Sequence, residues 1–317
     1  MKQSVSIYDT LIIGGGPAGI FAAALAHNKG LNPLLIEANE YLGGQPKLLY
    51  SQKPIYDYPV HYGIKAYQLV DLLIERLKNT PVPVKLGVQI TDIKKSNNGF
   101  DVKLNDKSII RTQTIIIATG AGIFNPNRLE TAGVNHTHVH YAVEDFSKYT
   151  KRHVVVLGGG DSAVDWANEI AKCAKPKSVS IIHRREEFRT SGDNAKNLSK
   201  HKVKVYLNYS IENINKTHLV VKSNVNSKLQ KVLFDEIIVQ YGQSIDTNSL
   251  KIFNGININK AGRISVGINQ MTNLPSIYAI GNICTYEGKP SSIVCAHGEA
   301  AVAVRHILDT IKPYAKK

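Results

Sequence analysis

The sequence has only three cysteines in its 317 residues, and no two of them form a CxxC pair. This scarcity argues against a disulfide-stapled scaffold, a zinc ribbon and a thioredoxin-type redox motif. The chain also lacks a basic, apolar and small-residue cleavage pattern at its start, and it has no long uninterrupted apolar run. We therefore expect a soluble protein of the cytoplasm that does not act at a membrane.

Acidic residues are scarce relative to basic ones: 25 Asp and Glu against 39 Lys and Arg, a formal charge of +14. Such a chain either has a solvated lysine-rich surface or meets an acidic partner. Nucleic acid is not expected as that partner, because there is no Lys/Arg block with interleaved aromatic residues and no named nucleic-acid motif. The length and the 43% hydrophobic content predict about two domains with proper cores.

The segment Thr10 to Gly19 reads TLIIGGGPAG and organises the chain. Its short apolar run predicts a buried strand, which leads into Gly14-x-Gly16-x-x-Gly19 and then into a helix-prone segment. In the dinucleotide fingerprint these glycines allow a tight turn, close approach of a pyrophosphate and close packing of helix on strand. The helix N-terminus then offers free N–H groups to the phosphates.

A second strand, 33–36, delivers Glu37, whose carboxylate can accept from ribose hydroxyls and would repel a 2′-phosphate. This combination predicts a site for a dinucleotide with an unphosphorylated ribose; the alternative is a plain glycine-rich turn. The stretch 39–62 is rich in Gly, Pro and Tyr and is too long for an ordinary connection, so we expect it to be functional. Within it, Gln45 can donate or accept hydrogen bonds and Tyr50 can lie flat on a planar ring.

A second fingerprint of the same kind follows in the middle of the chain. Its strand, glycine turn, helix and next strand are 154–157, Gly158-x-Gly160-x-x-Ala163, 161–172 and 179–182. The position that corresponds to Glu37 carries no acid. It holds the segment His183-Arg184-Arg185, and Arg189 lies one turn further on. Arginines bind phosphate in bidentate fashion and, in place of the ribose-binding acid, change the preference from NAD to NADP. The alternative is a basic surface cluster.

The two sites together predict FAD at the first and NADPH at the second. Period-two alternation predicts antiparallel strands over 82–118 and again over 203–239. The chain should cross back near 241–246 and end in a long helix over 293–311. We therefore predict an α/β fold of two Rossmann-like, three-layer ββα nucleotide-binding domains, one inserted into the other. The expected bounds are 1–120 and 244–317 for the FAD domain and 121–243 for the NADPH domain.

Several motifs carry a resemblance to one family over essentially the whole length. They are GGGPAG, GGQPKLLYSQKPIYDYP, IIATGAGIFNPNRLE, HYAVED, VVVLGGGDSAVDWA, SIIHRREEFR and YAIGNICTYEGK. The chain resembles the thioredoxin-reductase-like class of ferredoxin/flavodoxin–NADP(+) reductases. Thioredoxin reductases proper carry a catalytic dithiol just before the second fingerprint, whereas residues 141–145 contain no sulfur here. The resemblance thus implies that electrons leave from the flavin itself.

The resemblance also assigns roles to residues at both sites. It implies that Glu37 binds the FAD ribose and that Tyr50 stacks on the isoalloxazine. The other implied FAD residues are Gly14, Gly16, Pro17, Ala18, Gln45, Ile90, Phe124 and Asn282. The implied NADPH residues are Gly160, Ser162, His183, Arg184, Arg185 and Arg189, with the guanidiniums on the 2′-phosphate. No side chain is needed as a general base or nucleophile, because the cofactors carry the chemistry.

Two features depart from the family pattern. Asn282 stands where the family has Asp, which removes a charge-assisted hydrogen bond to the ribityl chain. The sequence ends at Lys317, before the tail that covers the other flavin face in the family, so either Tyr314 covers that face in part or the flavin is more open.

We expect hydride transfer from NADPH to FAD and then single-electron transfer to ferredoxin or flavodoxin, by a homodimer. One alternative is an NADPH-dependent reductase of a quinone, free flavin or ferric chelate; another is a nucleotide-binding redox sensor without turnover. The alternating His136, His138 and His140 would share one face of a strand. Metal binding is not expected there, because no cysteine or carboxylate accompanies them at ligand spacing. Cys284 and Cys295 are expected to be small buried residues.

Overall fold

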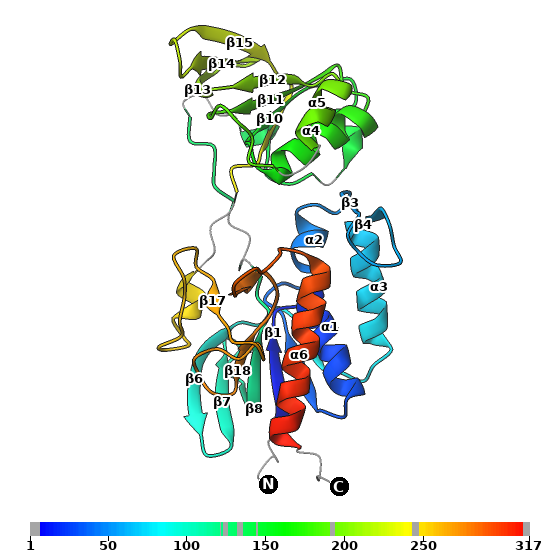
Figure 1. Cartoon of the computed structure of the whole chain (residues 1–317), viewed down its shortest axis with the longest axis vertical. Coiled ribbons are helices and arrows are strands. Elements are labelled where there is room, and N and C mark those ends of the chain that lie inside the picture. The colour runs from blue at the N-terminus through cyan, green and yellow to red at the C-terminus, as the bar shows by residue number, and fades with distance from the viewer. Residues whose placement is uncertain are drawn as a thin grey trace. The chain divides into compact units, whose positions relative to one another are not determined.

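The computed structural model describes residues 7–120, 122, 126–131, 136–143, 145–190, 194–242 and 247–312. These divide into two compact units (Figure 1). The first comprises the described residues of Met1–Lys47, Pro54–Phe124 and Ile245–Lys317, and the second those of Leu48–Lys53 and Asn125–Ser244. The second unit therefore interrupts the first. The domain bounds expected from the sequence remain predictions, and they place the short segment Leu48–Lys53 with the FAD domain instead.

The first unit is built on a seven-stranded sheet. The path of the sheet is β5 (Val84–Lys85), β2 (Pro33–Ile36), β1 (Ile7–Ile13), β8 (Ile109–Ile117), β7 (Gly99–Leu104) and β6 (Ile90–Ser96), with β18 (Ile277–Ala279) also on β8. β1 has a parallel partner on each side, so that Leu11 lies opposite both Leu34 and Ile115. The antiparallel pairs of this sheet are β6 with β7 and β7 with β8. The expectation of antiparallel strands over 82–118 is therefore wrong for β5, which pairs with β2 in parallel.

Helices α1 (Pro17–Asn28), α3 (Ala66–Lys78) and α6 (Ile293–Ile311) share a hydrophobic core with one face of this sheet. In Figure 1, α1 and α6 lie side by side. Both helices present alanines to the core, including Ala22 and Ala26 of α1 and Ala300 and Ala303 of α6, all fully buried. Small side chains allow the two helix axes to approach closely, which brings the N-terminal ends of the helices and the strand ends together.

The second unit has a five-stranded, all-parallel sheet of β12 (Lys204–Leu207), β11 (Ser178–His183), β10 (His153–Leu157), β16 (Glu236–Val239) and β9 (Val139–His140). The second unit also contains helices α4 (Asp161–Cys173) and α5 (Asn194–Lys200). It has a second, small antiparallel sheet of β13 (Tyr209–Ile214), β14 (His218–Ser223) and β15 (Leu229–Leu233). The prediction of one antiparallel layer over 203–239 is thus wrong at both ends. β16 buries Ile237 and Ile238 on opposite faces, as a central parallel strand must.

The remaining elements are short. They are α2 (Gly44–Leu48), β3 (Pro54–Ile55), β4 (Ile64–Lys65), β17 (Ile264–Ser265), β19 (Cys284–Thr285) and the 3-10 turns η1 (His136–His138), η2 (Phe146–Tyr149), η3 (Thr247–Leu250) and η4 (Gly281–Ile283). Among the residues that the structure describes, no helix is both long and apolar enough to cross a membrane.

Candidate nucleotide-binding sites

The first glycine turn joins the end of β1 to the start of α1. Gly14 has a φ of +110°, and a Cβ at this position would lie 2.5 Å from the carbonyl oxygen of Ala118. A Cβ on Gly19 would lie 1.9 Å from the carbonyl oxygen of Gly14. Both positions therefore require glycine. Gly16 precedes α1 in extended conformation and contributes no side-chain cap, so the first N–H groups of the helix stay available to an anion.

The loop before α2 packs directly on this turn. The Gly43 N–H donates to the Gly15 carbonyl at 2.8 Å, and a Cβ on Gly44 would lie 2.9 Å from the Cα of Gly16. Next to these glycines, the Nε2 atom of Gln45 is buried and has no hydrogen-bond partner among the described residues. A buried amide nitrogen without an acceptor is costly. A cofactor oxygen at the glycine turn would supply that acceptor, so this part of the site fits FAD.

Glu37 follows β2 and is only 8% exposed. Its Oε2 accepts from the Gly15 N–H at 2.6 Å, and its Oε1 accepts from the backbone and side-chain amides of Asn39 at 2.9 and 2.8 Å. These bonds hold the carboxylate against the glycine turn, where a ribose hydroxyl can donate to a remaining lone pair. The sequence predicted the acid but not its bond to Gly15.

The η4 turn, late in the sequence, packs beside the first glycine turn. A Cβ on Gly281 would lie 3.1 Å from the Cβ of Ala18, so η4 packs against the first turn of α1. Asn282, in the middle of η4, is exposed. Residues of the fingerprint and the late Gly-Asn pair, far apart in sequence, therefore meet at one end of the first unit.

Three other residues predicted to bind FAD pack against a hydrophobic core or lie outside the described residues. Ile90 begins β6 and is half-buried against the core of the first unit. Tyr50 lies in Leu48–Lys53 and packs against the core of the second unit, and Lys53 of the same segment forms an ion pair with Asp165 of α4. Phe124 lies outside the described residues, as does Tyr314. The roles of these residues in flavin binding stay predictions.

The second glycine turn joins β10 to α4. Gly158 has a φ of +145°, and a Cβ there would lie 2.4 Å from the carbonyl oxygen of Gln240. A Cβ on Gly160 would meet nothing within 4 Å, and α4 begins directly after it without a side-chain cap. Ser162 is exposed on the first turn of α4. At this turn, as at the first glycine turn, no side chain of the N-cap residue caps the start of the helix.

His183 lies between the second glycine turn and the arginines. It is 6% exposed, and a Cβ on Gly159 would lie 2.3 Å from its Nδ1. Burial lowers the pKa of His183, and the charges of the three nearby arginines lower it further. An imidazole held neutral in this way leaves the positive charge to the guanidiniums.

The three guanidiniums, on Arg184, Arg185 and Arg189, are exposed, and none of them pairs with a carboxylate within the described part of the chain. The Arg189 N–H donates to the Gly159 carbonyl at 2.6 Å, which fixes this arginine to the glycine turn. The carbonyls of Arg184 and Arg185 accept from Asn224 Nδ2 at 2.9 Å and from the Asn208 N–H at 3.0 Å. Three guanidiniums without a carboxylate partner among the described residues, beside an open helix N-terminus, form a site for a phosphate group.

The buried thiol of Cys284 does not form a reactive site. Cys284 is fully buried, and burial together with the nearby Glu299 raises the pKa of its thiol to about 12. Cys295 is half-buried and donates to the same carboxylate at 3.3 Å, whereas Cys173 is exposed on α4. A thiol that stays protonated, as that of Cys284 does, is neither a nucleophile nor a redox centre.

The histidines of the 136–140 segment do have a carboxylate nearby, contrary to the expectation from the sequence. Glu236 Oε2 lies 2.7 Å from His140 Nε2, and Glu236 Oε1 lies 3.8 Å from His138 Nδ1. The reason is topological: β16 pairs with β9, which brings residues 96 positions apart into contact. Across the described ranges, no group of three or more His, Cys, Asp or Glu side chains is arranged to hold a metal ion.

Sequence reasoning missed one cluster entirely. Glu299 of α6 is 3% exposed and contacts Tyr286, Lys289 and both cysteines of this region. The available signal was an acid within the apolar, alanine-rich stretch of the closing helix.

Two open glycine turns, one beside a buried acid and one beside three arginines, define a protein with two dinucleotide-binding units. The family described as pyridine nucleotide-disulphide oxidoreductase matches residues 8–300. The chain belongs to this family and, within it, to the thioredoxin-reductase-like ferredoxin–NADP reductases. The resemblance and the fold class predicted from the sequence are thereby confirmed.

The relatives that support this are similar over almost their full lengths. A ferredoxin–NADP reductase of Malacoplasma penetrans is 37% identical, with 97% of this chain and 98% of the relative covered. One from Streptococcus sanguinis is also 37% identical, with 98% and 96% covered. Among solved structures, thioredoxin reductase of Lactococcus lactis has a TM-score of 0.82 at 27% identity, covering 95% of this chain and 98% of that one. Thioredoxin reductase of T. acidophilum, with a TM-score of 0.84, 23% identity and coverage of 96% and 99%, shows the shared fold.

Proposed function

We propose that this chain is a FAD-containing oxidoreductase that takes a hydride from NADPH and passes single electrons to ferredoxin. The observation that carries the proposal is the contrast between the two glycine turns: a buried carboxylate accompanies the first, and three exposed guanidiniums accompany the second. The relatives named ferredoxin–NADP reductase support the choice of acceptor.

The first turn would hold FAD through groups of known position. The backbone at Gly14 and Gly16 and the start of α1 would bind the pyrophosphate, and Glu37 would accept from the ribose. The unpartnered Gln45 Nε2 would donate to a cofactor oxygen. When bound, FAD supplies the ability to take up a hydride and release electrons one at a time, which no side chain has. The protein binds and orients it.

NADPH would bind at the second turn as the hydride donor. The start of α4, with Gly160 and Ser162, would receive the pyrophosphate, and the guanidiniums of Arg184, Arg185 and Arg189 the 2′-phosphate. The buried His183 lies near these arginines and, because it is neutral, adds no positive charge to the site. NADH lacks the 2′-phosphate and would gain nothing from the three arginines.

The acceptor would be an acidic protein, ferredoxin or flavodoxin, because the chain carries a formal charge of +14. Opposite charge accelerates the encounter of two proteins, and salt weakens the effect. A homodimer in the cytoplasm is proposed from the resemblance alone. Reduction of a quinone, free flavin or ferric chelate is not favoured, since the relatives are named for ferredoxin. A sensor without turnover is likewise not favoured.

Stopped-flow spectroscopy tests the proposal. The flavin absorbance should bleach rapidly with NADPH and slowly with NADH, and ferredoxin or flavodoxin should restore it in single-electron steps. The rate of the second phase should fall as ionic strength rises. Reoxidation by quinone alone would overturn the proposed acceptor, and no bleaching by NADPH would overturn the enzyme assignment.

A further inference from the structure

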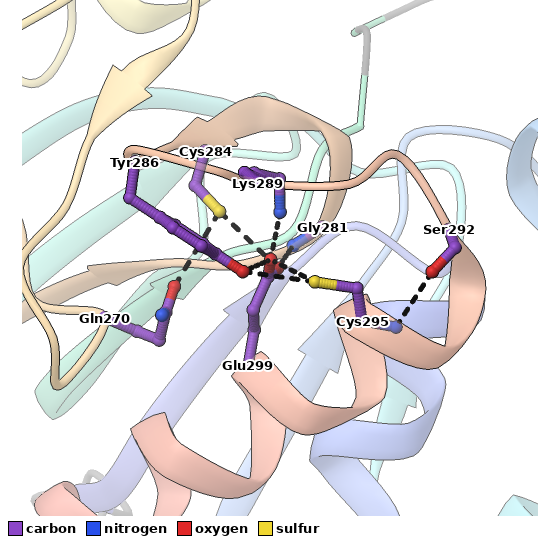
Figure 2. A network of polar contacts seen from close by, with 8 residues as sticks. All are labelled: Gln270, Gly281, Cys284, Tyr286, Lys289, Ser292, Cys295 and Glu299. Atoms are coloured by element: carbon purple, nitrogen blue, oxygen red, sulfur yellow. Dashed lines mark hydrogen bonds and ion pairs between the residues drawn. The ribbon is translucent and has the colours of Figure 1, made fainter.

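Glu299 lies at the centre of a buried polar cluster that none of the roles above uses (Figure 2). Its side chain is 2% exposed and that of Lys289, with which it forms an ion pair, is 4% exposed. Two opposite charges removed from water in this way are retained only where the geometry satisfies both of them. The cluster is therefore a specific structural element of the first unit, with its charges paired in place.

The donors to Glu299 come from several segments. Oε2 accepts from the Gly281 N–H at 2.6 Å and from Cys284 Sγ at 3.5 Å. Oε1 accepts from Tyr286 Oη at 3.0 Å and from Cys295 Sγ at 3.3 Å, in addition to Lys289. In Figure 2 all of these groups converge on the one carboxylate from η4, β19, the following loop and the first turn of α6.

Two of the donors, Tyr286 and Cys284, keep their protons. Burial raises the pKa of the Tyr286 hydroxyl, and its contacts with Cys295 and Glu299 raise it further. Burial and Glu299 raise the pKa of Cys284 to about 12. Glu299 is thus surrounded by donors alone, and an amide in its place would present an NH2 group to at least one of them.

The bond from the Gly281 N–H fixes the turn that faces α1. Gly281 has a φ of +74°, and its peptide N–H is buried against Glu299. On its other side, a Cβ would lie 3.1 Å from Ala18. The carboxylate therefore sets how closely η4, and with it Asn282, lies against the helix N-terminus assigned to FAD.

We propose that Glu299 is a positioning residue of the flavin site, whose carboxylate fixes the Gly281–Asn282 turn against the start of α1 while Lys289 neutralises it. This inference rests on the proposed function, because it assumes that FAD binds at α1. Glu299 itself contacts no substrate. It acts through the Gly281 peptide and the exposed Asn282 that follows.

The test measures FAD affinity of the holoenzyme, from the recovery of flavin fluorescence on serial dilution, together with thermal unfolding. Glu299→Gln should raise the dissociation constant for FAD about tenfold, because the amide NH2 would face one of the surrounding donors and the buried Lys289 would lose its countercharge, which displaces the Gly281 turn. In the double variant Glu299→Gln/Lys289→Met the amide NH2 can occupy the space of the ammonium, and its oxygen can again accept from Gly281. Affinity should then return to within about threefold of the parent.

Tyr278→Phe serves as the matched control. Tyr278 is 1% exposed, and its hydroxyl lies 2.8 Å from Nδ1 of His306, which lies about two turns beyond Glu299 on α6. This variant should lower the unfolding temperature without changing FAD affinity. The inference is overturned if Glu299→Gln leaves the affinity unchanged, if the double variant is no better than the single one, or if Tyr278→Phe weakens FAD equally. A parent protein that binds no FAD would instead overturn the proposed function.

Discussion

The selectivity for NADPH over NADH is the most direct test of the site proposed at the second glycine turn. The perturbation is the double variant Arg184→Ala/Arg185→Ala. It removes two of the three guanidiniums near His183 and leaves Arg189, whose backbone is bonded to Gly159. The carbonyls at 184 and 185 keep their bonds to Asn224 and Asn208, so the local backbone should persist.

The size of the effect follows from exposure. A hydrogen bond to a charged group contributes about 1.5–3 kcal/mol when shielded, but these guanidiniums are exposed and screened by solvent. About 0.5–1 kcal/mol for each is therefore appropriate. Removing two should cost about 1–2 kcal/mol, which raises the KM for NADPH by roughly 5- to 30-fold. The KM for NADH should change by no more than about threefold.

The assay is steady-state reduction of an artificial acceptor at fixed ionic strength, with each nucleotide varied in turn. Arg111→Ala is the control, because Arg111 is an exposed arginine of the first unit that pairs with Asp101 at 3.0 Å. It removes one positive charge without touching the second glycine turn and should leave both KM values unchanged. Equal losses for NADPH and NADH in the double variant would refute the 2′-phosphate assignment.

Three further outcomes are expected. Gly14→Ala should lower the free energy of unfolding by more than about 1 kcal/mol in a denaturant titration, because of its φ of +110° and the Ala118 carbonyl 2.5 Å from the new Cβ; an unchanged midpoint would contradict the tight turn. Maleimide at pH 7.5 should modify the exposed Cys173 and spare Cys284, whose pKa is raised to about 12, as peptide mass mapping would show. The modified protein should still reduce its flavin. Burial lowers the pKa of His297 from 6.5 to about 4, so the folded state disfavours the proton and stability is lost as the pH falls from 6.5 to about 4. His297→Phe should reduce that loss in thermal melts taken across this range.

The parts of the site that the sequence predicted are those made by one continuous segment. Strand, glycine turn and helix follow one another directly in both fingerprints, and Glu37 ends the next strand, so local patterns suffice. The closing helix over 293–311 was also predicted with its observed bounds, because its apolar residues recur with helical period.

What the sequence could not predict depends on contacts between distant segments. Period-two alternation does not distinguish a strand that joins a parallel sheet from one in an antiparallel hairpin, which is why β5, β12 and β16 were misplaced. The approach of Glu236 to His140 requires β9 and β16 to be neighbours. The donors around Glu299 converge only after the chain has turned back through η4 onto α6.

The interrupted sheet of the first unit has a consequence for synthesis on the ribosome. β18 pairs with β8, placing Ile277 opposite Ile115, and the core beneath them needs Ala300 and Ala303 of α6. Every strand of the second unit lies between these partners in sequence. The inserted unit can therefore complete its sheet while the residues that close the outer one are still untranslated. The N-terminal glycine turn, made first, acquires its η4 neighbour last, so a cofactor can be enclosed there only when the chain is nearly finished.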